Sequence, residues 1–186
     1  MLFDERGIQL AAMIDDYAAS RYLNLGTYKP IGQQVVTMWR AARIGGPLAA
    51  GICEWESGFR NVFGWDWGRY QVDKVPFARL PVTAERVAAL LAAIEKHDFS
   101  WSNGVGVTQI TYPPLLWRAE QMGGAHLTEV QLLVGFEQLR KNLDAADSWL
   151  AAVGAYNSGS VTRPNLDYAE GVAELAELWK ERFAAV

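Results

Sequence analysis

The sequence predicts a mainly α domain with one small irregular or β lobe and a cleft between that lobe and the helices. Most of the chain places apolar residues at the i, i+3, i+4, i+7 spacing of one helix face, between recognisable start and stop signals. Residues 58–81 depart from this pattern, because they are rich in glycine and aromatic residues and have no sustained helical period. With 186 residues, 51% of them hydrophobic, the chain is expected to form a single domain over residues 1–186.

Three helices are expected before the irregular segment. The first covers about residues 5–23, and the second follows Pro30 and stops at the glycine pair 45–46. Pro47 is well placed to open the third helix, because proline is favoured in the first helical turn. Residues 58–81 are then expected to form loops and a short hairpin, and an irregular segment of this length is usually functional.

The remainder of the chain returns to helical patterns. Thr83 is expected to cap a helix that reaches Ile94, and residues 97–106 are rich in turns. Pro113 and Pro114 open a helix that stops at the glycine pair 123–124. The sequence Thr128-Glu129-Val130-Gln131 has the capping-box pattern for a helix to about residue 143. Two more helices are expected, over residues 145–156 and from about residue 167, the last with an inner face of Val172, Leu175, Leu178, Trp179 and Phe183.

Composition excludes several classes of protein. A net charge of −4 without a cluster of Lys or Arg argues against binding of nucleic acid. The longest apolar run, residues 87–94, is far shorter than the ~20 residues of a membrane span, so no membrane insertion is expected. The charged N-terminus lacks the pattern of a signal peptide, which predicts synthesis without a secretory signal in the cytoplasm. The single cysteine excludes an intrachain disulfide.

One glutamate stands at the end of an apolar helical stripe. Ala49, Ile52, Cys53 and Glu56 share one helix face, so Glu56 is expected to face the core and Cys53 to be a small buried residue. Desolvation disfavours a charged carboxylate and raises its pKa, as a general acid requires. Glu54 lies about 200° away around the helix and cannot form a close dyad with Glu56. The stripe alone also fits a helix-end glutamate without a catalytic role.

Two later segments extend this glutamate into an ordered set of motifs. Glu56-Ser57-Gly58 is followed by Gly104-Val105-Gly106-Val107-Thr108-Gln109-Ile110-Thr111 and by Ala155-Tyr156-Asn157-Ser158-Gly159. This order resembles the superfamily of soluble lytic transglycosylases and goose-type lysozymes, and the likeness covers most of the chain. The closer resemblance is to the lysozyme-like domain of endolysins (lysin A) from phages of actinobacteria. Segments 61–66, 123–124 and 134–136 also match motifs of that domain.

The resemblance implies an α+β lysozyme-like fold and a muramidase activity. The implied reaction is cleavage of the β-1,4 bond between N-acetylmuramic acid and N-acetylglucosamine in peptidoglycan, by hydrolysis or lytic transglycosylation, with Glu56 as the catalytic acid. The segment around Gln109 would line the floor of the cleft, and Tyr156 would help to orient Glu56. The candidate substrate-binding residues are Ser57, Gln109, Ile110, Thr111, Tyr156, Asn157, Trp65 and Trp67.

A second carboxylate would be needed by an inverting hydrolase, about 6.5–9.5 Å from the acid. Asp66 is the first candidate, because it lies in the irregular segment between two tryptophans whose rings would suit sugar faces. Core packing is the simpler explanation for any single tryptophan. Residues 68–74 also resemble the Gly-x-x-Gln-Val-Asp-Lys motif of goose-type lysozymes, which makes Asp73 a reserve candidate. A transglycosylase would need neither.

Other chemistries have less support in the sequence. A cysteine peptidase would pair Cys53 with His97 or His126, but Cys53 lacks the glycine and aromatic context of such nucleophiles. A zinc amidase would need three ligands from a pool of two histidines without metal-like spacing, so no metal and no cofactor is expected. The alternative that stays open is a catalytically inactive peptidoglycan-binding or virion structural domain with the same fold.

The resemblance also implies partners and a place of action. The expected partner is the glycan strand of peptidoglycan, and the chain is expected to be a monomer. A phage lysin is made in the cytoplasm of its bacterial host and acts on the cell wall after release. Access to the wall and attachment to it would then come from a holin and from a separate binding domain.

Overall fold

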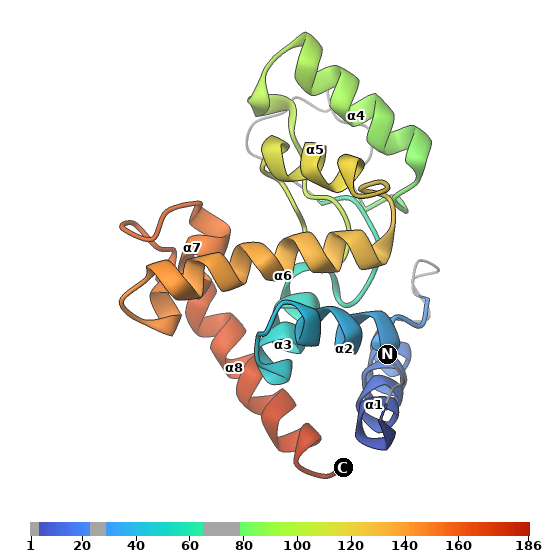
Figure 1. Cartoon of the computed structure of the whole chain (residues 1–186), viewed down its shortest axis with the longest axis vertical. Helices are drawn as coiled ribbons and strands as arrows, with labels where there is room; N and C mark the ends of the chain where they lie inside the picture. Colours follow the sequence, from blue (N-terminus) through green and yellow to red (C-terminus); the bar gives the residue numbers. More distant parts are fainter. Residues whose placement is uncertain (1–3, 23–28, 65–78) are drawn as a thin grey trace.

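The structure of the protein, a computed structural model, describes residues 4–22, 29–64 and 79–186 (Figure 1). The described part is mainly helical, as the sequence predicts. Its elements in chain order are α1 (Glu5–Tyr22), α2 (Gly32–Ala41), α3 (Gly46–Ser57), α4 (Ala84–Lys96), the short 3-10 helix η2 (Phe99–Trp101), α5 (Pro113–Gln121), α6 (Thr128–Ala145), α7 (Trp149–Ser158) and α8 (Leu166–Phe183).

The predicted start and stop signals account for most of these helices. Pro47 lies in the first turn of α3, and Gly58 ends that helix in the left-handed conformation, at φ 61°. The hydroxyl of Thr83 caps α4 by accepting from the backbone N–H of Arg86. Helix α7 begins four residues later than predicted, because the hydroxyl of Ser148 caps it. The helix boundaries are therefore set largely by local sequence.

The helices pack around two hydrophobic cores. The first core lies among α1, α2, α3, α7 and α8, which we call the first lobe. The second core lies among α4, α5 and the segments around Phe63 and Val105, which we call the second lobe. Helix α6 crosses between the two lobes, with α4 and α5 on one side of it and α1, α2, α3 and α8 on the other (Figure 1). It contributes Val130 and Val134 to the second core and Leu132, Phe136 and Leu139 to the first.

The second lobe is built from helices more than from strands. Among residues 61–64 and 79–127, β structure is limited to three isolated antiparallel bridges, which join Val62 to Pro81, Phe63 to Val105, and Val105 to Ile110. The predicted β element is thus reduced to single bridges within the described part of the chain. Glycine-rich backbone here favours tight turns over a continuous ladder.

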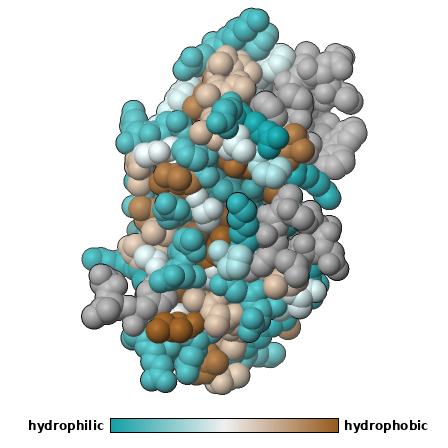
Figure 2. Space-filling view, turned by 90° about the vertical axis from the view of Figure 1, so that its right-hand side faces the viewer, coloured by the Kyte–Doolittle hydropathy of each residue, from teal (hydrophilic) through white to brown (hydrophobic). Residues whose placement is uncertain are grey.

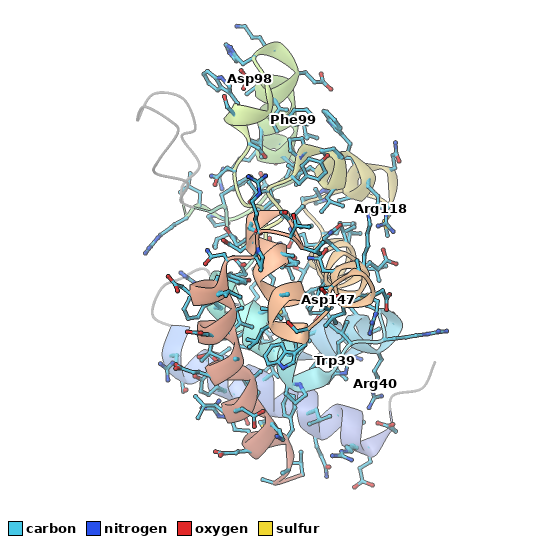
Figure 3. The ribbon with its side chains drawn as sticks, turned by 90° about the vertical axis from the view of Figure 1, so that its left-hand side faces the viewer. Trp39, Arg40, Asp98, Phe99, Arg118 and Asp147 are labelled. Carbon is cyan, nitrogen blue, oxygen red and sulfur yellow. The ribbon has the colours of Figure 1, made fainter. Side chains whose placement is uncertain are left out.

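The far end of the second lobe is the turn that carries η2. The carboxylate of Asp98 caps this turn by accepting from the backbone N–H of Ser100 at 2.6 Å. Asp98 and Phe99 lie at the outer end of the second lobe, well away from Trp39 and Arg40 in the first (Figure 3). The molecule is therefore elongated along the line that joins the two lobes.

Helices α3 and α8 approach each other closely. A Cβ atom at Gly51 would lie 3.1 Å from the backbone nitrogen of Ala176, so the glycine permits this approach. The carboxylate of Glu54 lies in the same interface, where it accepts from the hydroxyl of Tyr17 at 2.5 Å and from the indole N–H of Trp179 at 2.9 Å. A buried carboxylate is stable when donors satisfy it in this way. Glu54 thus links α1, α3 and α8.

Two details of the helix predictions are wrong. Thr128 and Gln131 do not form a capping box, because the N-cap of α6 is Leu127 and the side chain of Gln131 is fully buried in a network described below. Leu178 is predicted on the inner face of α8 but is 46% exposed. The buried face of α8 is narrower than the predicted apolar stripe, because α8 packs mainly against α3 and α7.

The surface is predominantly polar on the face shown in Figure 2, where hydrophobic side chains form separate islands among hydrophilic ones. None of the helices in the described ranges combines the length and the apolar character that a membrane crossing needs. Many of the larger apolar side chains are collected in the two cores, whereas others, such as Trp55 and Trp149, are exposed.

Candidate active site

Glu56 lies in the last turn of α3, where the first lobe meets the segment 104–111. Its side chain is half-buried, and its Oε1 accepts a hydrogen bond from the hydroxyl of Tyr168 at 2.5 Å. Tyr168 is in the first turn of α8, 112 residues further along the chain, and is only 6% exposed. The hydrogen bond from a buried phenol fixes one oxygen of this carboxylate in place.

The two glutamates of α3 have different surroundings. Glu54 is the more buried, at 8% exposed, and both of its oxygens accept from side chains of the first core. The prediction that Glu56 faces the core rather than water is therefore only half correct. The reason is that α1 and α8 cover the other side of α3 as well, so the apolar stripe is not the only buried face. As predicted, the two carboxylates point to different partners and form no dyad.

Hydrogen bonds hold the segment 104–111 against the end of α3 and against α6 and α7. The hydroxyl of Ser57 donates to the carbonyl of Val107 at 2.9 Å, and the hydroxyl of Tyr156 donates to the carbonyl of Thr108 at 2.8 Å. The Thr108 hydroxyl in turn donates to the carbonyl of Gln131 at 3.0 Å. The three motif segments recognised in the sequence, around residues 57, 108 and 156, therefore meet at one place.

Gln131 is the buried hub of this arrangement. Its side-chain oxygen accepts from the backbone N–H of Val107 at 3.2 Å. Its amide nitrogen donates to the side chain of Asn61 at 2.9 Å and to the carbonyl of Ala125 at 2.7 Å. Since one side chain satisfies three separate segments, the loop positions on both sides of α6 depend on it.

Gln109 has a largely structural environment. Its backbone adopts the left-handed conformation, at φ 49°, and its amide nitrogen donates to the carbonyls of Val62 at 3.0 Å and Gly106 at 2.6 Å. Cβ atoms at Gly64 and Gly104 would come within 2.4 and 2.3 Å of its side-chain oxygen. The side-chain N–H groups of Gln109 thus stabilise the conformation of this loop.

The remaining candidates are distributed around this centre. Ile110 is buried in the second core, whereas Thr111 is exposed. Asn157 is exposed, and its side-chain oxygen accepts from Asn165 at 2.8 Å. Trp65, Asp66, Trp67 and Asp73 lie outside the described residues.

Helix α6 approaches the site through a glycine. A Cβ atom at Gly135 would lie 2.4 Å from the Thr108 hydroxyl and 2.9 Å from the Tyr156 hydroxyl. Any side chain here would push the segment away from α6. Gly135 therefore permits the close packing that brings Tyr156 and Thr108 together.

The charge of Glu56 affects the titration of its neighbours. Burial, followed by the negative charge of Glu56, raises the pKa of the Tyr168 hydroxyl, of the Tyr156 hydroxyl and of the Cys53 thiol. The hydrogen bond to Glu56 adds to the effect on the pKa of Tyr168. All three groups stay protonated at neutral pH, so Tyr168 remains a hydrogen-bond donor throughout that range.

The structure describes the surroundings of Cys53 and His97, the residues considered for a cysteine peptidase. Cys53 is buried, as predicted, and its raised pKa opposes formation of a thiolate. His97 is exposed and stacks on Trp101, with ring centroids 3.9 Å apart. Within the ranges 4–22, 29–64 and 79–186, no three side chains of His, Cys, Asp or Glu are grouped as metal ligands.

Tyr168 is the residue of this site that the sequence patterns do not single out. It precedes Val172 and Trp179 on the inner face of α8 and so has the pattern of a core residue. The available signal is a tyrosine at the end of an apolar stripe, since a buried hydroxyl requires a polar partner. Its partner cannot be identified without the fold.

Comparison with known proteins gives no match: no family model, no curated protein and no solved structure is significantly similar to this chain. The case for a function thus depends on the geometry around Glu56 and on the motif resemblance described above. The hydrogen bonds of Ser57 and Tyr156 to the segment 107–108 are the observed link between the motif segments.

Proposed function

We propose that the protein is a glycosidase that cleaves the β-1,4 bond between N-acetylmuramic acid and N-acetylglucosamine in peptidoglycan glycan strands, with Glu56 as the general acid. The observation that carries the proposal is the setting of Glu56: a half-buried carboxylate held by the Tyr168 hydroxyl beside the segment 104–111. The substrate would lie in a cleft between the two lobes, with that segment as its floor.

The chemistry requires a proton at the leaving oxygen. A glycosidic oxygen is a poor leaving group unless it is protonated as the bond breaks, and a carboxylic acid at a fixed position supplies that proton. Because Tyr168 donates to Oε1 of Glu56, the transferable proton would be carried on Oε2. After transfer, the same hydroxyl stabilises the carboxylate that remains. Glu56 can then act as a base towards water or a sugar hydroxyl.

Glu56→Gln tests the assignment, with Glu54→Gln as the matched control on the same helix. The amide cannot donate the required proton, so we expect the E56Q variant to lose at least ~100-fold in clearance of a peptidoglycan suspension. The E54Q variant should clear the suspension at nearly the normal rate, at a temperature where circular dichroism shows both variants folded. Unchanged clearance by E56Q would contradict the role of Glu56.

Mass spectrometry of the released fragments distinguishes the two forms of the reaction. Reducing ends indicate hydrolysis, and 1,6-anhydromuramic ends indicate transglycosylation by attack of the muramic acid 6-hydroxyl. A hydrolase would next be examined by Asp66→Asn and Asp73→Asn, the two candidates for the second carboxylate. Loss of cleavage in one of these variants identifies it.

The alternative proposal is an inactive peptidoglycan-binding or virion structural domain of the same fold. It predicts that the wild type sediments with purified cell walls and releases no fragments. Under the main proposal the partners are the glycan strands and, for access and attachment to the wall, a holin and other domains. The chain would act as a monomer after release from the bacterial cytoplasm.

A further inference from the structure

Trp55, the residue between the two glutamates of α3, keeps a large part of its indole in water. It is 48% exposed, whereas Trp39 and Trp179 in the first core are 5% and 0% exposed. A tryptophan offers a large apolar surface that is normally removed from water. An indole that is half in water beside a candidate catalytic acid is a surface available to a ligand.

The indole is nevertheless held firmly on its other side. A Cβ atom at Gly171 of α8 would lie 2.3 Å from Cη2 and 2.4 Å from Cζ3 of Trp55, so the ring rests directly on the helix backbone. The ring of Tyr168 contacts it edge-on, with centroids 6.0 Å apart and planes at 86°. A ring fixed in this way loses little conformational freedom when a ligand covers it.

Tyr168 connects this indole to the acid. Its ring contacts Trp55, and its hydroxyl donates to Glu56 at 2.5 Å. The exposed indole and the carboxylate are therefore neighbours with a fixed relation to each other.

We infer that Trp55 forms the aromatic wall of a sugar subsite next to Glu56, which takes the hydrophobic C–H face of an N-acetylated hexose of the glycan strand. This inference rests on the proposed function. The ligand class follows from the surface: a flat, uncharged ring suits a sugar face, and the indole N–H suits a hydroxyl or an acetamido oxygen at its rim.

The test measures binding separately from cleavage. In the E56Q background, affinity for a tetrasaccharide of alternating N-acetylglucosamine and N-acetylmuramic acid is measured by titration calorimetry, with and without Trp55→Leu. We expect the W55L change to weaken binding about tenfold and the W55F change to weaken it less. With Glu56 intact, the W55L variant should show a higher KM and a nearly unchanged kcat.

Trp149→Leu is the matched control, because Trp149 lies at the start of α7 and is similarly exposed, at 45%. Among the described residues, the ring of Tyr168 is paired with Trp55 and not with Trp149. Gly171→Ala is a second, independent change, since its Cβ displaces the indole without removing it; it should also weaken binding. Thermal unfolding shows whether each variant is folded. If W55L does not fold, W55F, which retains an aromatic ring at this position, takes its place in the binding test.

The outcomes separate this inference from the proposed function. Weakened binding in W55L and G171A, with normal binding in W149L, supports the subsite even if the wild type proves to cleave nothing. Unchanged binding in folded W55L, or an equal loss in W149L, overturns the subsite. In that case the clearance assay of the E56Q variant still tests the proposed function independently.

Discussion

Removal of the Tyr17 hydroxyl tests the claim that Glu54 is a structural carboxylate. Phenylalanine keeps the ring, so its edge-to-face contact with Trp179 at 4.9 Å and the Arg182 guanidinium at 4.2 Å from the ring are retained. Only the hydrogen bond to Glu54 is deleted, and the carboxylate stays buried with one donor fewer. A hydrogen bond to a charged group contributes roughly 1.5–3 kcal/mol.

We therefore expect Y17F to lower the free energy of unfolding by about 2 kcal/mol. For a chain of this length that corresponds to a decrease of roughly 4–8 °C in Tm. Urea unfolding followed by circular dichroism measures the change, and an unchanged m value shows that the same surface is exposed in both proteins. Under the proposed function, cleavage below the transition should be unaffected, because Glu54 and Glu56 have separate partners.

A double-mutant cycle with Glu54→Gln completes the test. The coupling energy between the two positions should be between about 0.5 and 3 kcal/mol, because the two side chains are in direct contact. A change below ~0.5 kcal/mol in Y17F, or additive effects in the double variant, would refute the structural role assigned to this pair.

Three further predictions concern the site and its support. Tyr168→Phe should lower kcat about 10- to 100-fold, because Glu56 loses the donor that orients it; steady-state cleavage of soluble glycan checks this, and an unchanged kcat would count against it. Burial and a carboxylate partner raise the pKa of Tyr17 to about 12, so Tyr17 keeps its proton to a higher pH in the folded chain than in the unfolded chain. The contribution of Tyr17 to the free energy of unfolding should therefore be constant below about pH 10 and be lost as the pH rises from about 10 to 12, so the fall over this range should be smaller in Y17F than in the wild type; urea unfolding of both proteins across this range shows whether it is. Gln131→Leu should lower the free energy of unfolding by about 3–5 kcal/mol, because the Val107 N–H, the Ala125 carbonyl and the half-buried side-chain oxygen of Asn61 each lose this partner; denaturation midpoints equal to those of the wild type would exclude this role of Gln131.

Local sequence is sufficient to predict most of the helices. Pro47, Thr83 and Pro113 act within one turn of their own position, so their effect can be predicted without the fold. The pattern at Thr128 and Gln131 fails for the opposite reason. A capping box satisfies two N–H groups locally, but here the glutamine side chain bonds to Val107 and Asn61, 24 and 70 residues away, as well as to the nearby carbonyl of Ala125, and these tertiary hydrogen bonds prevail.

The candidate site is predictable only in part. Helical periodicity and the motif order nominate Glu56 as the candidate acid, but periodicity does not show that Glu54 is the more buried of the two glutamates. The hydrogen-bond donor of Glu56 cannot be predicted, because Tyr168 is 112 residues away and has the spacing of an ordinary core residue of α8. Likewise, the partners of Glu54 are 37 and 125 residues distant, so its burial follows from how α1 and α8 pack and not from its neighbours in sequence.

Helix α6 has a consequence for engineering. Val134 packs in the second core and Phe136 in the first, so opposite faces of this one helix belong to different lobes. The lobes are joined by a shared helix rather than by a linker. The lobes are therefore not interchangeable modules: a foreign second lobe grafted through the loops would meet a mismatched helix face. An exchange intended to alter specificity has to carry the second-lobe face of α6 with it, and to keep Gly135 and Gln131, which hold the segment beside Glu56.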